Sequence, residues 1–271
     1  MASELSPALS HREIDPVSPP APWLGGKRAL AGRITAMIEQ VPHAIYCEPF
    51  VGMGGIFFRR RAAPRTEVIN DRSGDVANLF RILQRHYPQF MDTLRFQIAS
   101  RREFERLKAA NPETLTDLER AARFLYLQRL AFGGKAVGQN FGVSLERGSR
   151  FNLTRLGSLL EEVHERLSGV TIECLDWAPF IDRYDREQTL FYLDPPYWGC
   201  EDDYGKQIFD RDQFAAIAER LGRIKGRFIL SINDVPEIRT IFSAFDIQEV
   251  RLRYTVNNNK STDARELIIS G

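Results

Sequence analysis

The sequence predicts an α/β fold built on a mostly parallel sheet. Two strand-helix units open the folded part: an apolar run at residues 44–50 leads into a glycine loop, and a second run at 66–71 leads into an amphipathic helix. Strand patterns give way to helix formers between residues 79 and 168 and resume from residue 169. We therefore expect a sheet domain from residues 22–78 and 169–271, a helical domain inserted at 79–168, and a Ser- and Pro-rich disordered tail at 1–21.

Each further element follows from its own pattern. Apolar residues at helical spacing predict helices over 27–41, 75–87, 117–130, 211–224 and 235–245, with another over 56–63 after the glycine loop. Apolar, β-branched and aromatic runs predict strands over 169–175, 189–194, 226–233, 245–254 and 264–270. Only residues 255–263 separate the last two strands, too few for a helical crossover. They should therefore form an antiparallel hairpin at one edge, which makes the sheet mixed.

Overall composition names no partner. The 271 residues carry a formal net charge of +1, with 43% apolar and 27% charged residues, as in ordinary soluble proteins. Three cysteines without C-x-x-C spacing and four scattered histidines predict neither a disulfide framework nor a metal site. No run approaches about 18 apolar residues and the N-terminus lacks a signal-peptide core, so we expect a cytoplasmic protein without membrane contact.

Three acidic residues follow predicted strands: Glu48, Asp71 and Asp194. In open α/β sheets, ligands bind at the carboxyl ends of strands, near the point where strand order reverses. Gly52 and Gly54, after Glu48, allow a close backbone approach, and Asp71 can accept hydrogen bonds from ribose hydroxyls. The pattern indicates a nucleoside-cofactor pocket, although the loop by itself is equally compatible with a plain tight turn. Its spacing is not that of a dinucleotide G-x-G-x-x-G.

The stretch "PWLGGKRAL" offers a second set of candidate ligand contacts. Trp23 can stack on a ring and Lys27 can bind a carboxylate, with two glycines between them. The alternative is a helix start preceded by a glycine turn. A phosphate-binding P-loop is excluded, because Arg28 follows Lys27 where that motif requires Ser or Thr.

The stretch "FYLDPPYWG" ends a strand that is apolar on both faces and should be central. Pro195 and Pro196 have no backbone N–H, so the loop after Asp194 offers carbonyl and carboxylate acceptors but few donors. Tyr197 adds a stacking surface. We therefore interpret the stretch as a site for a flat nucleobase with an exocyclic amine, in preference to a simple stiff turn. The role of Trp198 stays open.

The chain resembles the Dam-type DNA adenine methyltransferases. The resemblance is carried, in order, by "WLGGK" (23–27), "EPFVGMGG" (48–55), "IND" (69–71), "FLYLQR" (124–129) and "DPPY" (194–197). It covers residue 22 to the C-terminus, and the order is that of the family's α arrangement. It implies a methyltransferase domain with a Rossmann-like sheet that uses S-adenosylmethionine as methyl donor. It also implies an inserted target-recognition domain and a location in the cytoplasm of a bacterial or phage-infected cell.

The same resemblance implies the roles of individual residues. Asp194, Pro195, Pro196 and Tyr197 would be catalytic, with the acid and the Pro195 carbonyl accepting the hydrogens of a flipped adenine's 6-amino group. The cofactor contacts would be Trp23, Lys27, Glu48, Pro49, Phe50, Gly52, Gly54, Asp71, Asp176 and Asp194. No metal takes part.

The predicted DNA-binding region is locally basic. Between Arg120 and Arg155 seven basic residues stand against one acid, Glu146, a charge that suits phosphates. We expect DNA contacts from Arg129, Lys135, Gln139, Asn140, Arg147, Arg150 and Lys260. An arginine on a helix can equally be a solvated residue, and residues 257–265 can equally be a hairpin turn. The family's usual N-G-x-x-R-x-N and G-x-F-N-x-P stretches are absent, as in phage-type members, so GATC is only one candidate target.

Other functions compete with adenine methylation. The acceptor wall would also serve the 4-amino group of cytosine or an adenine in RNA. A catalytically dead DNA-binding module is opposed by the intact D-P-P-Y tetrapeptide, and an NAD-dependent dehydrogenase by the glycine spacing. We expect a monomer or weak dimer. The sequence does not decide the target, the processivity or whether a cognate restriction enzyme exists.

Overall fold

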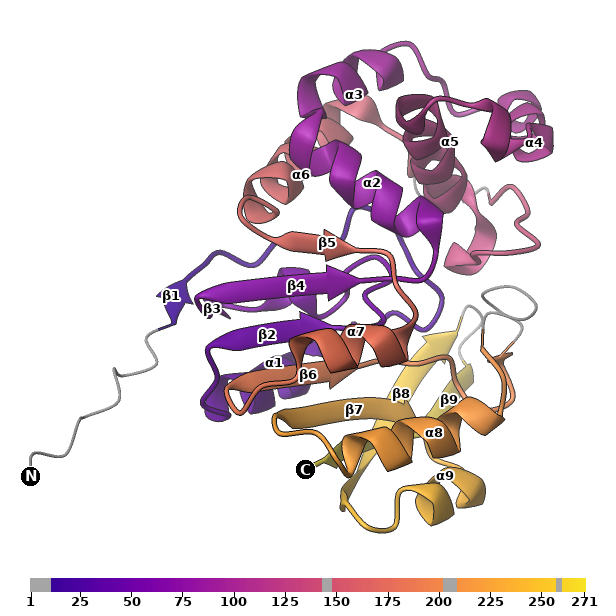
Figure 1. The fold of residues 1–271 in the computed structure, drawn as a ribbon. Coiled ribbons are helices and arrows are strands. Elements are labelled where there is room, and N and C mark those ends of the chain that lie inside the picture. Colours follow the sequence, from indigo (N-terminus) through magenta and orange to yellow (C-terminus); the bar gives the residue numbers. More distant parts are fainter. Residues whose placement is uncertain (1–10, 143–147, 202–208, 257–259) are drawn as a thin grey trace, which may run out of the picture.

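A seven-stranded sheet forms the centre of the protein in the computed structural model, which describes residues 11–142, 148–201, 209–256 and 260–271 (Figure 1). The strand order is β5-β4-β2-β6-β7-β9-β8. The first five are parallel, whereas β9 pairs antiparallel with both β7 and β8. Their bounds are β2 Ile45–Glu48, β4 Thr66–Asn70, β5 Thr171–Glu173, β6 Thr189–Leu193, β7 Arg227–Asn233, β8 Asp246–Val256 and β9 Lys260–Ser270. The predicted α/β class and the antiparallel edge hairpin are confirmed.

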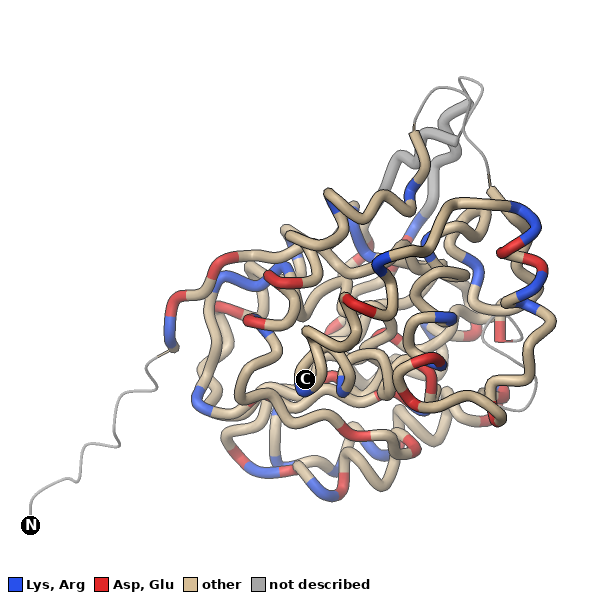
Figure 2. The backbone as a smooth tube through the Cα atoms, turned by 90° about the horizontal axis from the view of Figure 1, so that it is seen from above, with Lys and Arg blue, Asp and Glu red and all other residues tan. Residues whose placement is uncertain are grey.

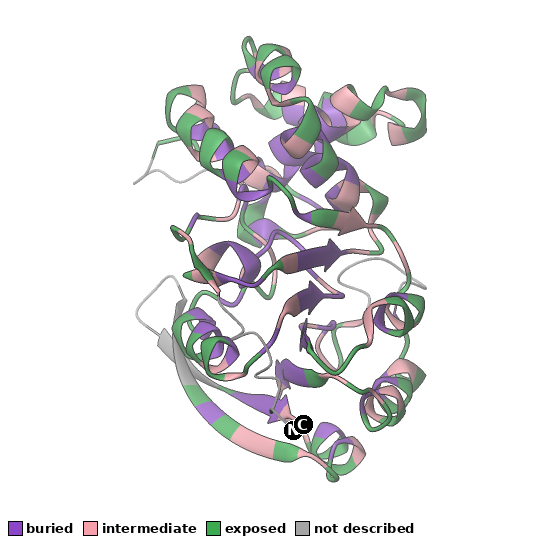
Figure 3. Cartoon of the chain, turned by 60° about the vertical axis from the view of Figure 1, so that its left-hand side comes forward, coloured by how far each residue is buried: buried purple, intermediate pink, exposed green. Residues whose placement is uncertain are grey.

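Alternating residues of the central strands face two different cores. On β6, Leu190 and Tyr192 join one buried cluster, while Phe191 and Leu193 join the other. The first face is covered by α1 (Ala31–Gln40) and the second by α7 (Trp177–Tyr184), α8 (Asp212–Leu221) and α9 (Pro236–Ile241). Figure 3 shows the strands buried between helices whose outer faces are exposed. A strand covered on both faces explains the continuous apolar run that precedes Asp194.

A helical layer stands beyond the β5 edge of the sheet (Figure 1). It consists of α2 (Gly74–Arg85), α3 (Tyr87–Leu94), α4 (Arg101–Ala109), α5 (Asp117–Leu130) and α6 (Leu153–Arg166), with a 3-10 turn at Pro112–Thr114. Thr116 and Glu119 form a capping box that starts α5. Side chains of this layer, such as Leu79 and Leu160, belong to the same buried cluster as Tyr46 and Ile69 of the sheet. The layer therefore shares its core with the sheet.

Two segments differ from the sequence prediction. Residues 56–63 form only a 3-10 turn (Phe57–Arg59) and the short strand β3 (Ala62–Ala63), because the consecutive Phe57 and Phe58 are both fully buried, which a surface helix does not permit. Residues 11–21, predicted as tail, lie against the body. There β1 (Arg12–Glu13) pairs with β3, and Val17 is buried. Helices α3, α4, α6 and α7 are additional to the helices predicted individually.

Charges are interspersed along the described chain, with basic and acidic residues near one another on most elements (Figure 2). This agrees with the formal net charge of +1. Within the same described residues, no helix has the length and apolar character needed to cross a membrane.

Candidate active site

A cavity of about 830 Å³, here called the central cavity, opens at the carboxyl ends of β2, β4 and β6. Strand β2 lies between the other two, so the chain order reverses there. The three acids predicted from the strand ends, Glu48, Asp71 and Asp194, all line this cavity. The sheet thus brings together residues that are up to 146 positions apart, as expected for a ligand site at a topological switch point.

Glu48 is a buried acid that lines the cavity. Its side chain is only 2% exposed, and it accepts a hydrogen bond of 2.6 Å from the Tyr46 hydroxyl. Burial raises the pKa of Glu48 to about 8, although the Tyr46 hydrogen bond and Arg60 lower it. At neutral pH the carboxyl group is therefore mostly protonated and can donate a hydrogen bond as well as accept one.

Asp71 holds the glycine loop in place. Its two carboxylate oxygens accept the backbone N–H of Gly52 at 2.8 Å and of Ser73 at 2.9 Å. Burial raises the pKa of Asp71 to about 6, against the lowering effect of these two hydrogen bonds. Each oxygen retains a lone pair, so Asp71 combines a loop-holding role with capacity to bind hydroxyl groups.

Asn70, which the sequence analysis did not single out, joins three strand ends. Its amide nitrogen donates to the carbonyls of Pro49 and Leu175, at 2.9 and 3.0 Å, and its amide oxygen accepts from the N–H of Leu175 at 2.8 Å. The walls of the cavity that follow β2, β4 and β5 are thereby fixed to one another. An Asn immediately before the acid that ends a strand is the only sequence signal for this role.

The two glycines of the loop have different neighbours. A Cβ atom on Gly52 would lie 2.6 Å from Nε1 of Trp23, so the absence of a side chain lets Trp23 reach the cavity wall. Gly54 has a φ of +73°, and a Cβ there would lie 2.3 Å from the Phe58 ring. Gly54 does not line the cavity; it makes the turn that allows Phe58 to pack beneath the loop.

Lys27 lies against the D-P-P-Y tetrapeptide. Its side chain is 3% exposed, and Nζ lies 2.7 Å from Oδ1 of Asp194. Nζ also donates to the Tyr197 hydroxyl at 2.8 Å and to the carbonyl of Gly25 at 3.2 Å. Burial raises the pKa of Asp194 to about 6, while Lys27 lowers it. Lys27, predicted as a cofactor contact, thus lies in the structure against a carboxylate of the protein itself.

The loop after Asp194 is held by its neighbours in space. Pro196 lines the central cavity, and Tyr197 packs with the buried cluster below the loop. The Trp198 ring packs on Phe214, with centroids 5.3 Å apart, and on Arg211. Trp198 thus anchors the loop on α8, which answers the question that the sequence left open.

One wall of the cavity is apolar and aromatic. It combines predicted Phe50 with Leu175, Trp177 and Phe209, and Phe50 meets Phe209 edge-to-face at 6.1 Å. Asp176, the other predicted cofactor contact here, is 53% exposed and pairs with Arg72 at 2.6 Å. Arg72 lines the cavity, whereas Asp176 does not.

The predicted DNA-binding residues fall into different environments. Lys135, Asn140 and Arg150 are exposed, while Arg147 and the side chain of Lys260 lie outside the described residues. Gln139 is only 8% exposed, and its amide nitrogen donates to Gln128 and to the Lys135 carbonyl, so it braces the loop instead of facing a base edge. Arg129 lines the cavity and donates to the carbonyls of Arg150 and Pro20.

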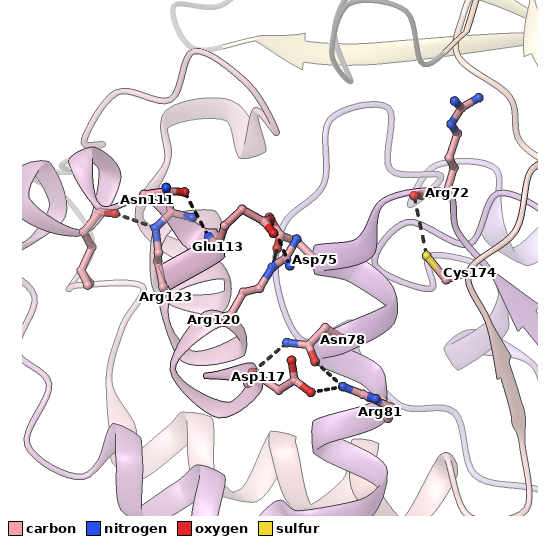
Figure 4. A network of polar contacts seen from close by, with 11 residues as sticks. Arg72, Asp75, Asn78, Arg81, Asn111, Glu113, Asp117, Arg120, Arg123 and Cys174 are labelled. Carbon is pink, nitrogen blue, oxygen red and sulfur yellow. Dashed lines mark hydrogen bonds and ion pairs between the residues drawn. The ribbon is translucent and has the colours of Figure 1, made fainter. Parts of the chain in front are cut away.

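Part of the basic surplus in this region is neutralised within the protein. Arg120 pairs with Asp75 and with Glu113, which lie on neighbouring segments (Figure 4). Arg123 donates to the carbonyls of Leu107 and Lys108. These two arginines join α5 to α2 and α4, so counting charges along the sequence overstates the charge that is available to phosphates.

Two apolar residues beside the cavity are exposed. Phe132 is 67% exposed on a 3-10 turn (Phe132–Gly134), and Val137, which lines the cavity, is 52% exposed. Both side chains are therefore accessible from solvent. No cluster of three or more His, Cys, Asp or Glu residues in the described part of the chain is arranged to hold a metal ion.

The sheet order, the three acids around one cavity and the D-P-P-Y tetrapeptide after the central strand agree with the Rossmann-like methyltransferase fold that the sequence predicts. The particular family follows from the sequence: the chain belongs to the D12 class N6 adenine-specific DNA methyltransferases, whose family model matches residues 23–256.

Three relatives span most of the chain. The type II methyltransferase M1.LlaDCHI of Lactococcus lactis subsp. cremoris is 26% identical over 265 residues, which cover 89% of each chain. The type II methyltransferase M.CviBI of Paramecium bursaria Chlorella virus NC1A is 21% identical and aligns over 88% of this chain and 91% of its own. The DNA N-6-adenine-methyltransferase of Escherichia phage P1 is 25% identical over 87% of this chain, but over only 32% of its own.

Proposed function

We propose that the protein transfers a methyl group from S-adenosylmethionine to the 6-amino group of an adenine flipped out of a specific duplex DNA sequence. One observation carries the proposal: the Asp194 carboxylate lines a cavity whose adjoining backbone, Pro195 and Pro196, has no N–H to donate. Such a wall suits a guest that presents two N–H donors, as an exocyclic amine does.

The central cavity fits the proposed cofactor. Its volume of about 830 Å³ falls within the range of about 300–1,000 Å³ that is usual for small-molecule sites. Phe50, Leu175 and Trp177 form an apolar wall suited to an adenine ring. Asp71 has lone pairs for ribose hydroxyls. When bound, S-adenosylmethionine supplies a methyl group activated by a positively charged sulfonium.

The protein's contribution to the reaction is orientation and charge. The amino lone pair of adenine is delocalised into the ring and is therefore a poor nucleophile. If Asp194 and the Pro195 carbonyl accept the two amino hydrogens, the nitrogen can become pyramidal and direct its lone pair at the methyl group. The carboxylate then stabilises the positive charge that develops on this nitrogen and is placed to accept the proton that it loses. Tyr197 supplies a ring for the base to stack on.

An amino group inside a duplex cannot reach this cavity, so the adenine has to be flipped out at a cost of about a few kcal/mol. The exposed side chains of Phe132 and Val137 are suited to pack against bases at the rim, and Lys135 and Arg150 to contact phosphates. GATC is the target sequence to examine first, because it is the family's commonest case.

Methyl transfer to defined DNA tests the proposal. The protein is incubated with S-adenosylmethionine labelled on the methyl group and with duplexes of varied sequence, and the DNA is then digested to nucleosides. We expect label in N6-methyladenine, confined to duplexes that share a short site. Label in N4-methylcytosine, in RNA only, or in no nucleoside despite measurable duplex binding would overturn the proposal.

A further inference from the structure

Ser231 is a polar residue within a buried apolar strand. It interrupts the apolar run from Phe228 to Ile232 on β7, and its side chain is fully buried. We propose that Ser231 is a positioning residue: its hydroxyl holds one oxygen of Asp194, so that the other oxygen is directed at the adenine amino group. This inference rests on the proposed adenine methylation, and it extends the site from the catalytic loop to the neighbouring strand.

The register of the sheet brings Ser231 to Asp194. Strands β6 and β7 are parallel, and Leu193 lies opposite Leu230, so the next pair in this register is Asp194 and Ser231. Successive side chains of a strand point to opposite faces of the sheet. Ser231 therefore shares its face with Tyr192, which stands two positions before Asp194 on β6.

A chain of two hydrogen bonds ends on the carboxylate. The Ser231 hydroxyl donates to Oδ1 of Asp194 at 3.3 Å, and its oxygen lies 2.7 Å from the Tyr192 hydroxyl. A serine hydroxyl has only one hydrogen. When that hydrogen goes to Asp194, the hydrogen between the two hydroxyls has to come from Tyr192. Each bond polarises the next one, so Tyr192 strengthens the hold of Ser231 on Asp194.

Ser231 acts from outside the central cavity. Its partner in the register of β9, Ile268, is apolar, and Ser231 does not line the cavity. A buried hydroxyl is costly without a hydrogen-bond partner, which gives Ser231 a reason to stay bound to Asp194. A ligand can therefore occupy the cavity without replacing Ser231 as a partner of the carboxylate.

The two oxygens of Asp194 differ in their contacts. Oδ1 accepts from Ser231 and lies 2.7 Å from Nζ of Lys27. Within the described residues, no hydrogen bond or ion pair reaches Oδ2. Asp194 lines the cavity, and its side chain is 23% exposed. A carboxylate that is held at one oxygen presents the lone pairs of the other in a fixed direction, as the amino group requires for in-line attack on the methyl group.

The same hydrogen bond favours the charged form of Asp194. Burial raises the pKa of Asp194 to about 6 against the lowering effect of Lys27, and Glu266 on β9 adds to the rise whereas the Ser231 hydrogen bond opposes it. The other titratable groups that interact with Asp194 are Glu48 on β2 and Tyr192 on β6. Loss of the Ser231 hydroxyl should therefore raise the pKa of Asp194, and methyl transfer should need a higher pH.

The test compares Ser231→Ala, Ser231→Thr and Thr189→Val with the wild-type protein. Ser231→Thr keeps the hydroxyl. Thr189→Val is the matched control, because Thr189 is equally buried at the opposite end of β6 and its hydroxyl donates to the Tyr184 carbonyl at 2.7 Å. Single-turnover methyl transfer at saturating donor and DNA gives the rate constant and its pH dependence. Equilibrium titrations give the Kd for S-adenosylmethionine and the Kd for duplex DNA.

For Ser231→Ala we expect the rate constant to fall by about 10- to 100-fold, the loss that a small misplacement of a reacting group causes. The acid limb should move up by about 0.5–1 pH unit, the equivalent of one neutral hydrogen bond. Both Kd values should change less than about threefold, because Ser231 acts on the reacting geometry and not on ligand binding. Ser231→Thr should restore the rate constant and the limb, and Thr189→Val should change neither.

An unchanged rate constant and acid limb in Ser231→Ala would overturn the inference, and so would equal losses in Ser231→Ala and Thr189→Val. If the wild-type protein does not methylate adenine, the proposed function fails separately. The ¹³C shift of the Asp194 carboxyl carbon, assigned by comparison with Asp194→Asn, is then followed during a pH titration without DNA. A pKa raised in Ser231→Ala but not in Thr189→Val supports the hold on Asp194, and identical titrations refute it.

Discussion

The backbone of Trp198 is clamped by the side chain of Asn233, whose amide oxygen accepts the Trp198 N–H at 2.9 Å and whose amide nitrogen donates to the Trp198 carbonyl at 3.1 Å. Asn233 is the last residue of β7, next to β6 in the sheet. Pro195 and Pro196 cannot continue the backbone ladder beyond β6. The side chain of Asn233 takes over that function and fixes the loop that carries Asp194 and Tyr197.

Replacing Asn233 with alanine should therefore loosen the catalytic loop. We expect a loss of about 1 kcal/mol or more in the free energy of unfolding, because two partly buried hydrogen bonds disappear, and a clear decrease in kcat. Asn111→Ala is the matched control, since Asn111 is exposed and caps a short turn away from the cavity. Denaturant unfolding and methyl incorporation measure both effects. If the two variants have the same free energy of unfolding and the same rate of methyl incorporation, the clamp is dispensable.

Asp194→Asn should retain binding of S-adenosylmethionine but lose turnover. The amide carries no charge to stabilise the amino nitrogen, and it leaves Lys27 without its anion. We expect methyl transfer to fall by about 100- to 1000-fold, the range for removing one preorganised electrostatic contact. Asp92→Asn, at an exposed position of α3 that does not line the cavity, is the control. Transfer close to the wild-type rate in Asp194→Asn would rule out the catalytic role.

Two variants of Tyr197 separate its ring from its hydroxyl. Tyr197→Phe keeps the stacking surface and loses the hydroxyl that accepts a hydrogen bond from Lys27. Tyr197→Ala loses both, and stacking on a base is worth about 1–3 kcal/mol. We expect kcat/KM for DNA to fall much further in the alanine variant than in the phenylalanine variant. If the phenylalanine variant is as impaired as the alanine variant, the ring is not the stacking surface.

Gly54→Ala should destabilise the protein, although Gly54 lies outside the cavity. The substitution puts a side chain at a φ of +73° and a Cβ within 2.3 Å of the Phe58 ring. The left-handed conformation by itself costs about 1–2 kcal/mol, and the clash adds to it. Gly32→Ala in α1, where a Cβ meets nothing within 4 Å, should instead stabilise by about 0.5–1 kcal/mol. Thermal melting of both variants checks the difference in sign.

Glu48 should make stability depend on pH. The folded-state pKa of about 8 is above its ordinary value of 4.5, so the folded protein binds the proton more tightly than the unfolded chain does. Stability from this group therefore falls as pH rises from about 4.5 through about 8. Glu48→Gln should be progressively more stable than the wild type over that range, whereas Glu162→Gln on the exposed face of α6 should not. If the free energy of unfolding depends on pH in the same way for Glu48→Gln and the wild type, the assigned pKa is contradicted.

Much of the site could be predicted because acids that end neighbouring parallel strands must meet at one edge of the sheet. The proximity of Glu48, Asp71 and Asp194 could be predicted from these strand ends alone, without knowledge of side-chain contacts. The partners of Lys27 and Asn233 could not be predicted, because they depend on how loops distant in sequence pack together. Residues 56–63 formed no helix, because burial of two consecutive phenylalanines outweighed local helix propensity.

Local charge predicted the DNA-binding residues less reliably than strand ends predicted the acids of the cavity. Arg120 and Arg123 were counted in the local basic charge of residues 120–155, yet both bind partners inside the helical layer. Gln139 likewise supports its own loop. Basic and amide side chains indicate a nucleic-acid surface only when they are not already engaged in ion pairs or hydrogen bonds within the protein. Which of them are engaged can be seen only in the structure.

The central claim is that the cavity beside Asp194 methylates the 6-amino group of adenine in duplex DNA. The most direct measurement is nucleoside analysis of duplex DNA after incubation with methyl-labelled S-adenosylmethionine and either the wild-type protein or Asp194→Asn. The account predicts labelled N6-methyladenine with the wild-type protein and almost none with the variant. Equal labelling by the two proteins, or label in cytosine instead of adenine, would contradict it.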